Sequence, residues 1–531
     1  MLSRLVSVFN TIKYLQPVQI KYQLWYRFKT RFIHLGKYKK YTANTLHPVS
    51  TAGYAKLIPS TGKYLGNHSF SFLNLSHDFI GAVDWNYMEH GKLWNYNLQY
   101  FDFLHDPAIS NEEKEALIGS FASDLLNSVV KPEPYPVSLR LMNWILFYSN
   151  TGYCSALFEK ALKLQVGYLQ SNLEFHIKAN HLLENYIALV FSALVLHDHD
   201  LAIQAWGKIE EQVNEQVLPD GGHYECSPMY HSILMGKLIL LTSAADKAGW
   251  YSFDLSLIKN KLSDMLGWLN SFCFNDDSWA YFNDATGGIA PLTNDLRSAA
   301  EEIGIVAKVK QLQGSGYRKM TGNNYELLID AGDIIPSYQP GHAHSDMLSF
   351  CLQHDNKPLL VDTGISTYQP NAQRKQQRGT PAHNTVTMNG KDQSQVWGSF
   401  RVGKRAKMTI HEDEPFFLKA SHNGYKAALG ITHTRIFTAE QNAINITDNI
   451  SGNRTRAAAV AYFHFNWQAK VVVDETVATI MLNDVVLLSF TGHTKIFKET
   501  YQQATAFNET RQSTCIKVSF DASLITTIRF N

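Results

Sequence analysis

The spacing of apolar residues changes near residue 320, and this change limits what the chain can fold into. From about residue 95 to 310, apolar residues recur at intervals of three and four, which predicts helices joined by short polar or glycine-containing connections. The predicted helices are Asn111–Leu126, Ser138–Tyr148, Cys154–Glu174, His181–Leu196, Asp200–Val217, Met229–Ala248 and Leu255–Phe272. Many consecutive helices with short connections favour pairs wound into an arc or toroid.

After residue 320 the apolar segments become short and rich in β-branched and aromatic residues, with Gly, Asn and Asp between them. The predicted strands are Tyr325–Asp330, Met347–Gln353, Pro358–Asp362, Asn384–Met388, Ala406–His411, Ile431–Thr438, Asn442–Ile450, Ala457–Phe465, Ala469–Val473 and Val485–Phe490. Helices followed by strands indicate separate domains, and the strand spacing is typical of an antiparallel sandwich. We expect an α+β protein with a basic helical arm and linker at 1–90, a toroid at 91–315 and a β-sandwich at 316–531.

The amino-terminal segment is strongly basic. Eleven Lys and Arg residues lie between Arg4 and Lys63, and the first acidic residue is Asp78. Apolar residues follow helical spacing up to Leu15, and Pro17 ends that run. Two interpretations remain open: a pair of helices packed on the main body, or a basic amphipathic element on an anionic membrane surface.

Several classes of protein are disfavoured. The five cysteines are scattered without CxxC spacing, so neither a disulfide framework nor a cysteine zinc site is predicted. Lys13 and polar residues interrupt any signal-peptide core, and no later segment has eighteen uninterrupted apolar residues. We expect a cytoplasmic protein, or one held peripherally at the inner membrane face, with a periplasmic location as the alternative.

The first motif that carries chemistry is Asn180-His181-Leu182-Leu183-Glu184-Asn185 at the start of a predicted helix. His181 and Glu184 are three residues apart and share a face. An amide at Asn180 could cap the helix or meet a substrate carboxylate. A cap with a structural His–Glu hydrogen bond is the simpler explanation of this motif taken alone.

The second motif runs from Asp220 to His231. Asp220-Gly221-Gly222 predicts a tight turn, and Ser227-Pro228 predicts the cap and first position of a helix. Tyr230 and His231 then lie in the first helical turn, in a position to face a cleft. A half-buried structural tyrosine is the simpler alternative.

The third motif contains His342 and His344, which strand alternation would aim the same way. Asp362 and His383 follow at the ends of neighbouring predicted strands. Two imidazoles on one face, with a carboxylate and a third imidazole from neighbouring strands, would suit a His-Asp-His zinc site. The alternative is a hydrogen-bonded network in a sandwich core.

A basic strip follows between Thr363 and Ile410, with Tyr368 and Trp397 interleaved. Its basic residues are Arg374, Lys375, Arg378, Lys391, Arg401, Lys404, Arg405 and Lys407. Electrostatics alone would also suit a nucleic acid backbone. No nucleic-acid module signature accompanies the strip, so an anionic sugar polymer is the better prediction.

Taken in order, the motifs NHLLEN, DGGHYECSPMYH, GHAHSD, VDTG and GTPAHNTVTMNG resemble the heparinase II/III superfamily of polysaccharide lyases. Leu93–Phe101 and Arg140–Trp144 also resemble that family's helical domain, so the resemblance covers roughly residues 90–400. It implies an incomplete (α/α) toroid followed by an antiparallel β-sandwich. The basic arm and the lack of a visible export signal are more similar to relatives from capsule or exopolysaccharide gene clusters.

The resemblance also implies roles for individual residues. Asn180 or His181 would neutralise a uronate carboxylate, and Tyr230 and His342 would transfer protons. The resemblance implies one structural divalent ion, expected to be zinc, on His344, Asp362 and His383. Residues of these segments that we expect to contact an acidic polysaccharide are Asn143, Glu184, Tyr224, Arg378 and Trp397.

The chemistry explains these residue types. A proton next to a charged carboxylate is weakly acidic, so donors that stabilise the developing enolate oxygens must lower the barrier. A tyrosine is a poor base unless basic neighbours favour its phenolate, whereas a histidine titrates near neutrality. We expect Tyr230 as the acid and His342 as its partner, although the sequence leaves this division open.

Two other classes of function compete with a lyase. A glycosidase would need two carboxylates across the cleft, for which Glu184, Glu225 and Asp284 are candidates. A non-catalytic glycan-binding protein of capsule or exopolysaccharide assembly would need no proton-transfer pair.

Overall fold

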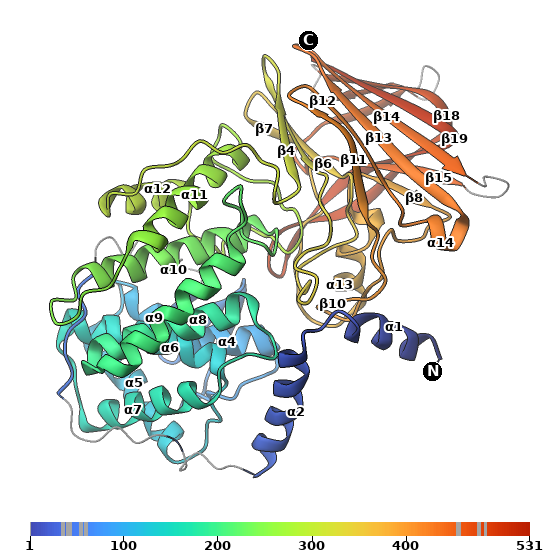
Figure 1. Ribbon diagram of the computed structural model, residues 1–531. Helices are drawn as coiled ribbons and strands as arrows, with labels where there is room; N and C mark the ends of the chain where they lie inside the picture. The colour runs from blue at the N-terminus through green and yellow to red at the C-terminus, as the bar shows by residue number, and fades with distance from the viewer. Residues whose placement is uncertain are drawn as a thin grey trace.

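The computed structural model describes residues 2–32, 45–51, 62–452, 458–474, 479–482 and 486–530, with the single positions 38 and 57. A helical domain and a β-domain lie next to each other, and the amino-terminal helices lie at their junction (Figure 1). This arrangement confirms the predicted order of helices before strands.

The helical domain contains α4 (Lys92–Tyr100), η2 (Asp102–His105), α5 (Asn111–Leu126), α6 (Pro134–Thr151), α7 (Ala156–Ser171), α8 (Ala179–Leu196), α9 (His199–Gln216), α10 (Pro228–Asp246), α11 (Ser256–Phe272) and α12 (Thr293–Glu302). Helices that are consecutive in sequence pack together, as α8 does with α9 and α10 with α11. Helix α8 is long and apolar enough to cross a membrane, yet 94% of that window is buried in the protein, which identifies it as the central core helix.

The start of α10 forms as its sequence predicts. Ser227 is the N-cap, and its hydroxyl accepts a hydrogen bond from the Tyr230 amide. In the turn before it, Gly221 has φ +91°, and a Cβ there would collide with the Asp264 carbonyl. Cap and turn together place Tyr230 in the first turn of α10.

A small sheet occupies part of the segment that we expected to be a helical arm and linker. It is formed by β1 (Gly62–Gly66), β2 (Ser69–Phe72) and β3 (Leu75–Asp78) in consecutive order. Phe70 and Phe72 are fully buried and join the core of the helical domain. Two-residue turns at Asn67-His68 and Leu73-Asn74 adopt positive φ, which suits tight hairpins.

The β-domain is built mainly from two antiparallel sheets, beside a short two-stranded one. The smaller has the order β4 (Tyr317–Thr321), β5 (Tyr325–Asp330), β6 (Phe350–His354) and β7 (Lys357–Leu360). The path of the larger is β11 (Met408–Glu414), β12 (Phe417–His422), β13 (Ile431–Ala439), β14 (Ala443–Gly452), β19 (Glu509–Phe530), β18 (Val486–Ala506), β17 (Thr479–Leu482) and β16 (Val471–Asp474). Off this path, β15 (Ala459–His464) pairs with β19 and with β8 (Val386–Met388).

One face of each sheet is apolar, and the two apolar faces share one core, as the sandwich prediction requires. Strand β13 alternates buried and half-buried residues along its whole length. Short elements complete the domain: α13 (Ala372–Gln377), η3 (Thr380–Ala382), β9 (Val396–Trp397), β10 (Arg401–Val402) and α14 (Lys426–Leu429).

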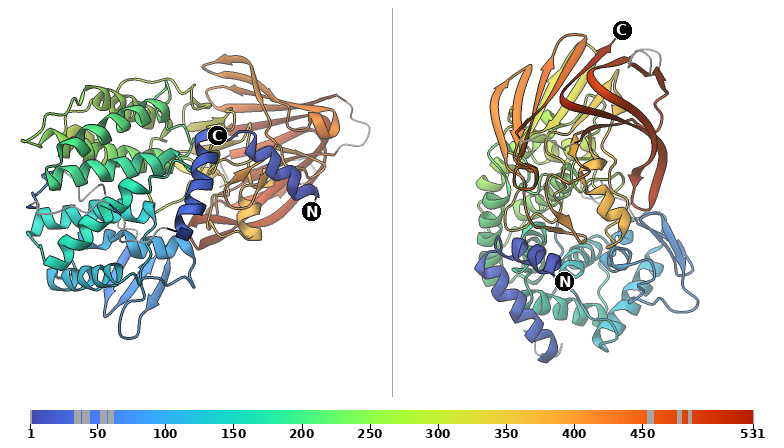
Figure 2. Two further views of the ribbon diagram at one scale, coloured as in Figure 1. Left: turned by 60° about the horizontal axis from the view of Figure 1, so that its bottom comes forward. Right: turned by 90° about the vertical axis from the view of Figure 1, so that its right-hand side faces the viewer.

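The amino-terminal arm consists of α1 (Leu2–Ile12) and α2 (Pro17–Phe32). Helix α1 lies below the β-domain in Figure 1, and α2 crosses in front of the domain junction in Figure 2 (left). Trp397 donates its ring N–H to Thr11 of α1 at 3.1 Å. Lys29 of α2 donates to the Ser171 carbonyl, so the arm contacts both domains.

Candidate active site

A cavity of about 1140 Å³ lies where the arm and the two domains meet. Six of the residues expected at the site line it: Asn180, His181, Glu184, Tyr230, His342 and Trp397. The arm forms part of the wall through Ile12 of α1, Leu15 between the helices, and Leu24 and Arg27 of α2. Residues separated by more than 300 positions in sequence therefore share one site.

Tyr230 and His342 come from different domains and meet at the cavity. Their ring centroids are 4.0 Å apart. The Tyr230 hydroxyl also lies 3.2 Å from the hydroxyl of Tyr368. A residue at the start of α10 and one in a loop of the β-domain are thus in contact, as a shared role in proton transfer requires.

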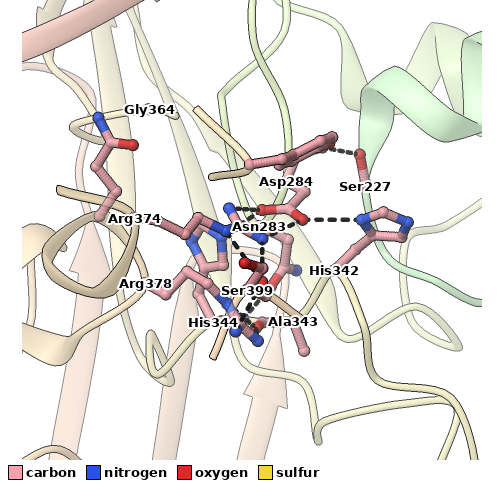
Figure 3. Close-up of polar contacts among 12 residues, drawn as sticks. Ser227, Asn283, Asp284, His342, Ala343, His344, Gly364, Arg374, Arg378 and Ser399 are labelled. Carbon is pink, nitrogen blue, oxygen red and sulfur yellow. Dashed lines mark hydrogen bonds and ion pairs between the residues drawn. The ribbon is translucent and has the colours of Figure 1, made fainter. Parts of the chain in front are cut away.

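Asp284 organises the histidines of the β-domain from behind the cavity (Figure 3). Its two oxygens lie 2.8 Å from His342 Nδ1 and 2.9 Å from His344 Nε2. The Arg374 guanidinium donates to both oxygens as well. Burial acts to raise the pKa of Asp284, but Arg374 and the two imidazoles outweigh it and hold that pKa well below its usual range.

The charge on Asp284 sets the tautomer of His342. An ionised carboxylate only accepts hydrogen bonds, so Nδ1 of His342 carries the proton. In the neutral ring, Nε2 then carries the lone pair that a base needs, and the carboxylate of Glu225 lies beside it, with Oε1 at 3.8 Å. The His342 side chain is 10% exposed and borders the cavity, so a substrate can reach it.

The segment around His342 and His344 is an irregular loop, which corrects the expectation of a strand. The two imidazoles are nevertheless related, because both contact Asp284. Arg378 holds the loop by donating to the Ala343 carbonyl at 2.8 Å. His342 borders the cavity, whereas His344 is fully buried behind it.

His181 is held by a buried carboxylate that sequence reasoning missed. Its Nδ1 lies 3.0 Å from Glu174 Oε1, and Asn185 donates to the other oxygen of Glu174 at 3.0 Å. Burial acts to lower the pKa of His181, but Glu174 outweighs burial and raises that pKa above its usual value. His181 is therefore suited to present a positive charge to the cavity.

Tyr135 completes the surroundings of His181. Its ring stacks on the imidazole with centroids 4.1 Å apart, and its hydroxyl donates to Glu184 Oε1 at 2.9 Å. Glu184 therefore contacts Tyr135 rather than His181, which was its expected partner.

Asn180 lies in the first turn of α8, and its side chain borders the cavity. The N-cap position belongs to Lys178, whose side chain makes no capping bond. Lys178 and Ala179 both adopt positive φ, at 64° and 51°. Such strain in residues with a Cβ persists only where the surroundings enforce it, and it is common at functional sites.

The environment of Tyr230 favours its protonated form. Burial raises the pKa of the hydroxyl, and the hydrogen bond with Tyr368 offsets only part of this effect. Arg374 also lowers the pKa of Tyr230, but by less than Tyr368 does. Tyr230 is therefore better suited to donate a proton than to accept one.

Three residues that we expected to contact substrate lie behind the cavity wall. Asn143 is buried in α6 and donates to the Tyr100 carbonyl at 2.9 Å. Tyr224 is buried and is not among the residues that line the cavity. Arg378 is fully buried, and its guanidinium donates hydrogen bonds to main-chain carbonyls. None of these three side chains lines the cavity, and the polar groups of Asn143 and Arg378 are engaged within the protein.

The basic strip does not form one surface. Arg374 and Arg378 are fully buried, whereas Lys375 and Lys391 are exposed. Arg401 and Arg405 line the cavity, together with Arg27, Lys92 and Lys237 from the rest of the chain. The positive charge near the site thus comes from several elements, which a continuous run in sequence could not reveal.

The residues that reasoning from sequence missed are mostly partners of those it found. Glu174 and Tyr135 hold His181 and Glu184, and neither belongs to a motif. Asp284 had been considered only as a glycosidase carboxylate, and Tyr368 and Arg374 only as parts of the basic strip. The sequence offered one general reason to look for such partners: a buried histidine usually needs a hydrogen-bond acceptor for its ring N–H.

Three buried atoms near this site lack hydrogen-bond partners among the described residues. They are His344 Nδ1, His383 Nε2 and Asp346 Oδ2. Ligand atoms of the same three residues lie within 4.8 Å of one another. Two imidazoles and a carboxylate directed at one point fit a divalent cation.

The aspartate of this group differs from our expectation. Asp362 lies at 2.6 Å from Nδ1 of His383, the nitrogen on the other side of the ring. Asp284 likewise lies 2.9 Å from Nε2 of His344, the nitrogen opposite Nδ1. A carboxylate behind each imidazole orients the ring and strengthens the opposite nitrogen as a ligand. The structure therefore favours Asp346 as the ligand and Asp362 as the support of His383.

Two family models match most of the chain. The first, described as "Heparinase II/III N-terminus", matches residues 150–302. The second, described as "Heparinase II/III-like, C-terminal", matches residues 305–531. No curated protein matches the sequence significantly.

Solved structures of polysaccharide lyases share the fold. A structure named heparinase III aligns over 94% of this chain and 86% of its own length, with a TM-score of 0.65 and 14% identity. A heparan sulfate lyase HepC mutant from Pedobacter heparinus covers 93% and 85%, with a TM-score of 0.59 and 15% identity. A chondroitin AC lyase from Streptomyces coelicolor A3 covers 82% and 75%, with a TM-score of 0.51 and 9% identity.

Proposed function

The chain belongs to the heparinase II/III family, and from this membership and the geometry of the cavity we propose that it cleaves a uronate-containing acidic polysaccharide by β-elimination. The observation that carries the proposal is the contact between Tyr230 and His342 across the domain junction. Burial favours the protonated form of the tyrosine, and Nε2 of the histidine carries the lone pair in the neutral ring. One can donate a proton while the other accepts one.

The substrate carboxylate would bind at Asn180 and His181. The positive charge of His181 and the amide of Asn180 would stabilise the negative charge that develops as the C5 proton leaves. Nε2 of His342 would remove that proton. The Tyr230 hydroxyl would protonate the 4-O leaving group, and the Asp284 contact would stabilise the imidazolium that forms.

A divalent cation would supply structural support rather than chemistry. His344, His383 and Asp346 would hold it. His344, one of these proposed ligands, lies in the same loop as His342, and both histidines contact Asp284.

The glycosidase alternative is weakened by the positions of its candidate carboxylates. Asp284 is fully buried and bound by Arg374, and Glu225 is 2% exposed and absent from the cavity lining. Of the three candidates named from the sequence, only Glu184 borders the cavity, where Asp102 is a second carboxylate among the lining residues. A glycosidase requires two carboxyl groups that flank the scissile bond.

The test is to incubate the protein with a panel of acidic polysaccharides and record the ultraviolet absorbance of an unsaturated uronate. Neither hydrolysis nor binding creates this double bond. Tyr230→Phe removes only the hydroxyl and is expected to lower the rate by about 10²–10⁴-fold, the range for loss of a general acid. Tyr224→Phe is the matched control, because that ring lies behind the cavity wall, and it should keep most of the activity.

The proposed roles are wrong if Tyr230→Phe retains most of the activity on a substrate that the wild type cleaves. Product formation without an unsaturated sugar would instead point to hydrolysis. Binding of a polysaccharide without any product would favour a glycan-binding role.

A further inference from the structure

The amino-terminal arm has an inner face that contacts the protein. On α1, the Ser7 hydroxyl accepts a hydrogen bond from the Gln395 side chain at 2.8 Å, and Thr11 accepts one from Trp397. On α2, the Tyr22 ring lies 4.5 Å from Phe175, and Lys29 reaches the Ser171 carbonyl. These polar and aromatic contacts hold both helices in place along one side.

The outer face of the same two helices is apolar and exposed. Leu5 and Phe9, one helical turn apart on α1, are 60% and 69% exposed. Trp25 and Phe28 on α2 are 45% and 56% exposed, and their rings stack at 6.2 Å. None of these four side chains lines the cavity. Large exposed apolar side chains on both helices of the arm indicate an interaction surface.

Positive charge accompanies this apolar face. Lys13 and Lys21 are exposed, and the first 77 residues contain no Asp or Glu. We propose that the outer face of α1 and α2 binds the protein to an anionic membrane surface, with Leu5, Phe9, Trp25 and Phe28 in the interface between headgroups and acyl chains. Amphipathic helices that combine such aromatic and aliphatic residues with lysine lie in the plane of a membrane in this way.

The composition of the face argues against other occupants. A second copy would place one cationic arm against another, and like charges across an interface oppose association. An acidic polysaccharide would match the charge, but a hydrated polyanion does not cover exposed Leu and Phe side chains. An anionic bilayer satisfies both properties, because it takes up the apolar groups and attracts the lysines. The proposal does not depend on the lyase activity.

The experiment is co-sedimentation of the full chain with phosphatidylcholine vesicles, with and without phosphatidylglycerol. The wild type should sediment with the anionic vesicles and be released by salt. A Phe9→Ser/Phe28→Ser variant should bind at least about tenfold more weakly, because each ring withdrawn from water contributes a factor of that order. In a Lys13→Gln/Lys21→Gln variant, the affinity for anionic vesicles should fall about fivefold for each lysine removed.

The matched control is Ile80→Ser/Val309→Ser, which removes two fully exposed apolar side chains elsewhere on the molecule. It should bind vesicles as the wild type does. Thermal melting of each variant shows whether the fold is retained, and all are expected to melt near the wild type because the altered side chains face away from the core.

Failure of the wild type to bind anionic vesicles would overturn the proposal. So would equal loss of binding in the Ile80→Ser/Val309→Ser control. Vesicle binding that persists in the Phe9→Ser/Phe28→Ser variant, or an oligomer that this variant disrupts in sedimentation equilibrium, would assign the face to another partner.

Discussion

The properties of single residues at the cavity are set by the buried groups that contact them. Glu174 raises the pKa of His181 and so favours its cationic form, and Asp284 accepts from Nδ1 of His342, which leaves the lone pair of the neutral ring on Nε2. Neither property follows from the histidine alone, whose unperturbed pKa lies close to neutrality. The buried carboxylates are therefore as important to the proposed chemistry as the residues that touch the substrate.

Changing Glu174 to Gln tests the role of His181. The substitution removes the carboxylate that raises the His181 pKa, so the cation should be lost at a lower pH than in the wild type. The alkaline limb of the pH profile of kcat/KM should move to lower pH, with little change well below it. Kinetics on a cleaved polysaccharide across a pH series measure this. An unchanged profile would show that the charge of His181 is not required.

His342 and His344 are two residues apart and should respond differently to substitution. His342→Ala removes the proposed base and should abolish elimination while the melting temperature stays close to that of the wild type. His344→Ala should instead lower the melting temperature and the metal content. Its ring is fully buried and is one of the three proposed cation ligands, with Asp346 and His383. Rate, thermal melting and elemental analysis of both variants distinguish the roles. If the two variants behaved alike in all three measurements, the distinct roles proposed for the two histidines would be wrong.

At the scale of elements, loops rather than helices or strands carry most of the β-domain's part of the site. Asp284 joins one such loop and α13 to α10: its carbonyl accepts from Ser227 at 2.7 Å, and its carboxylate binds the His342–His344 loop and Arg374 of α13. All of these groups are buried. The carboxylate therefore fixes how the segments from the two domains fit together.

Asp284→Asn should destabilise the protein by about 3–5 kcal/mol, the usual cost of leaving a buried charge such as Arg374 without its partner. The matched control is Asp277→Asn, which removes a carboxylate paired with Arg297 at a partly exposed position. That loss should be below about 1 kcal/mol. Urea denaturation of both variants measures the difference. Similar losses would show that the burial of the Asp284 network adds nothing to stability.

Element prediction succeeded where one face of a segment is buried. Asn111–Leu126 was predicted with the bounds that α5 has, because its apolar residues follow the helical period. The strand predicted at Val485–Phe490 covers only the start of β18, which continues to Ala506 and pairs with β19 along its length. Much of β18 beyond Phe490 is polar and exposed, so its strand character comes from pairing with β19 and not from an apolar pattern.

At the scale of the whole molecule, the cavity exists only where the arm and both domains meet. Asn180 and Tyr230 belong to the helical domain, His342 to the β-domain, and Arg27 to the arm. The proposed cation ligands His344, Asp346 and His383 are buried behind the cavity, and Asp284 connects His344 to the proposed base His342. Stability of the β-domain and geometry of the site are therefore expected to change together.

Removal of the divalent ion should lower the melting temperature of the whole protein. Protein purified without chelator is expected to contain about one equivalent of a divalent metal, consistent with one group of ligands. Asp346→Ala should lose the metal and melt at a lower temperature, whereas Asp521→Ala, at an exposed position of the same domain, should do neither. Elemental analysis and thermal melting test this. A stable wild type that is free of metal would refute the proposed ion.

The sequence by itself determined the order of domains, the elements with one buried face, and the motifs that contain Asn180, His181, Tyr230 and His342. These features are local, because periodicity, caps and turns depend on neighbouring residues. The tertiary structure alone decided which carboxylate faces which nitrogen. It placed Asp346 rather than Asp362 in the cation group, buried Arg378, and brought Glu174 to His181 and the arm to the cavity. Such pairings depend on the direction of side chains from distant segments, and no local pattern in a sequence encodes that direction.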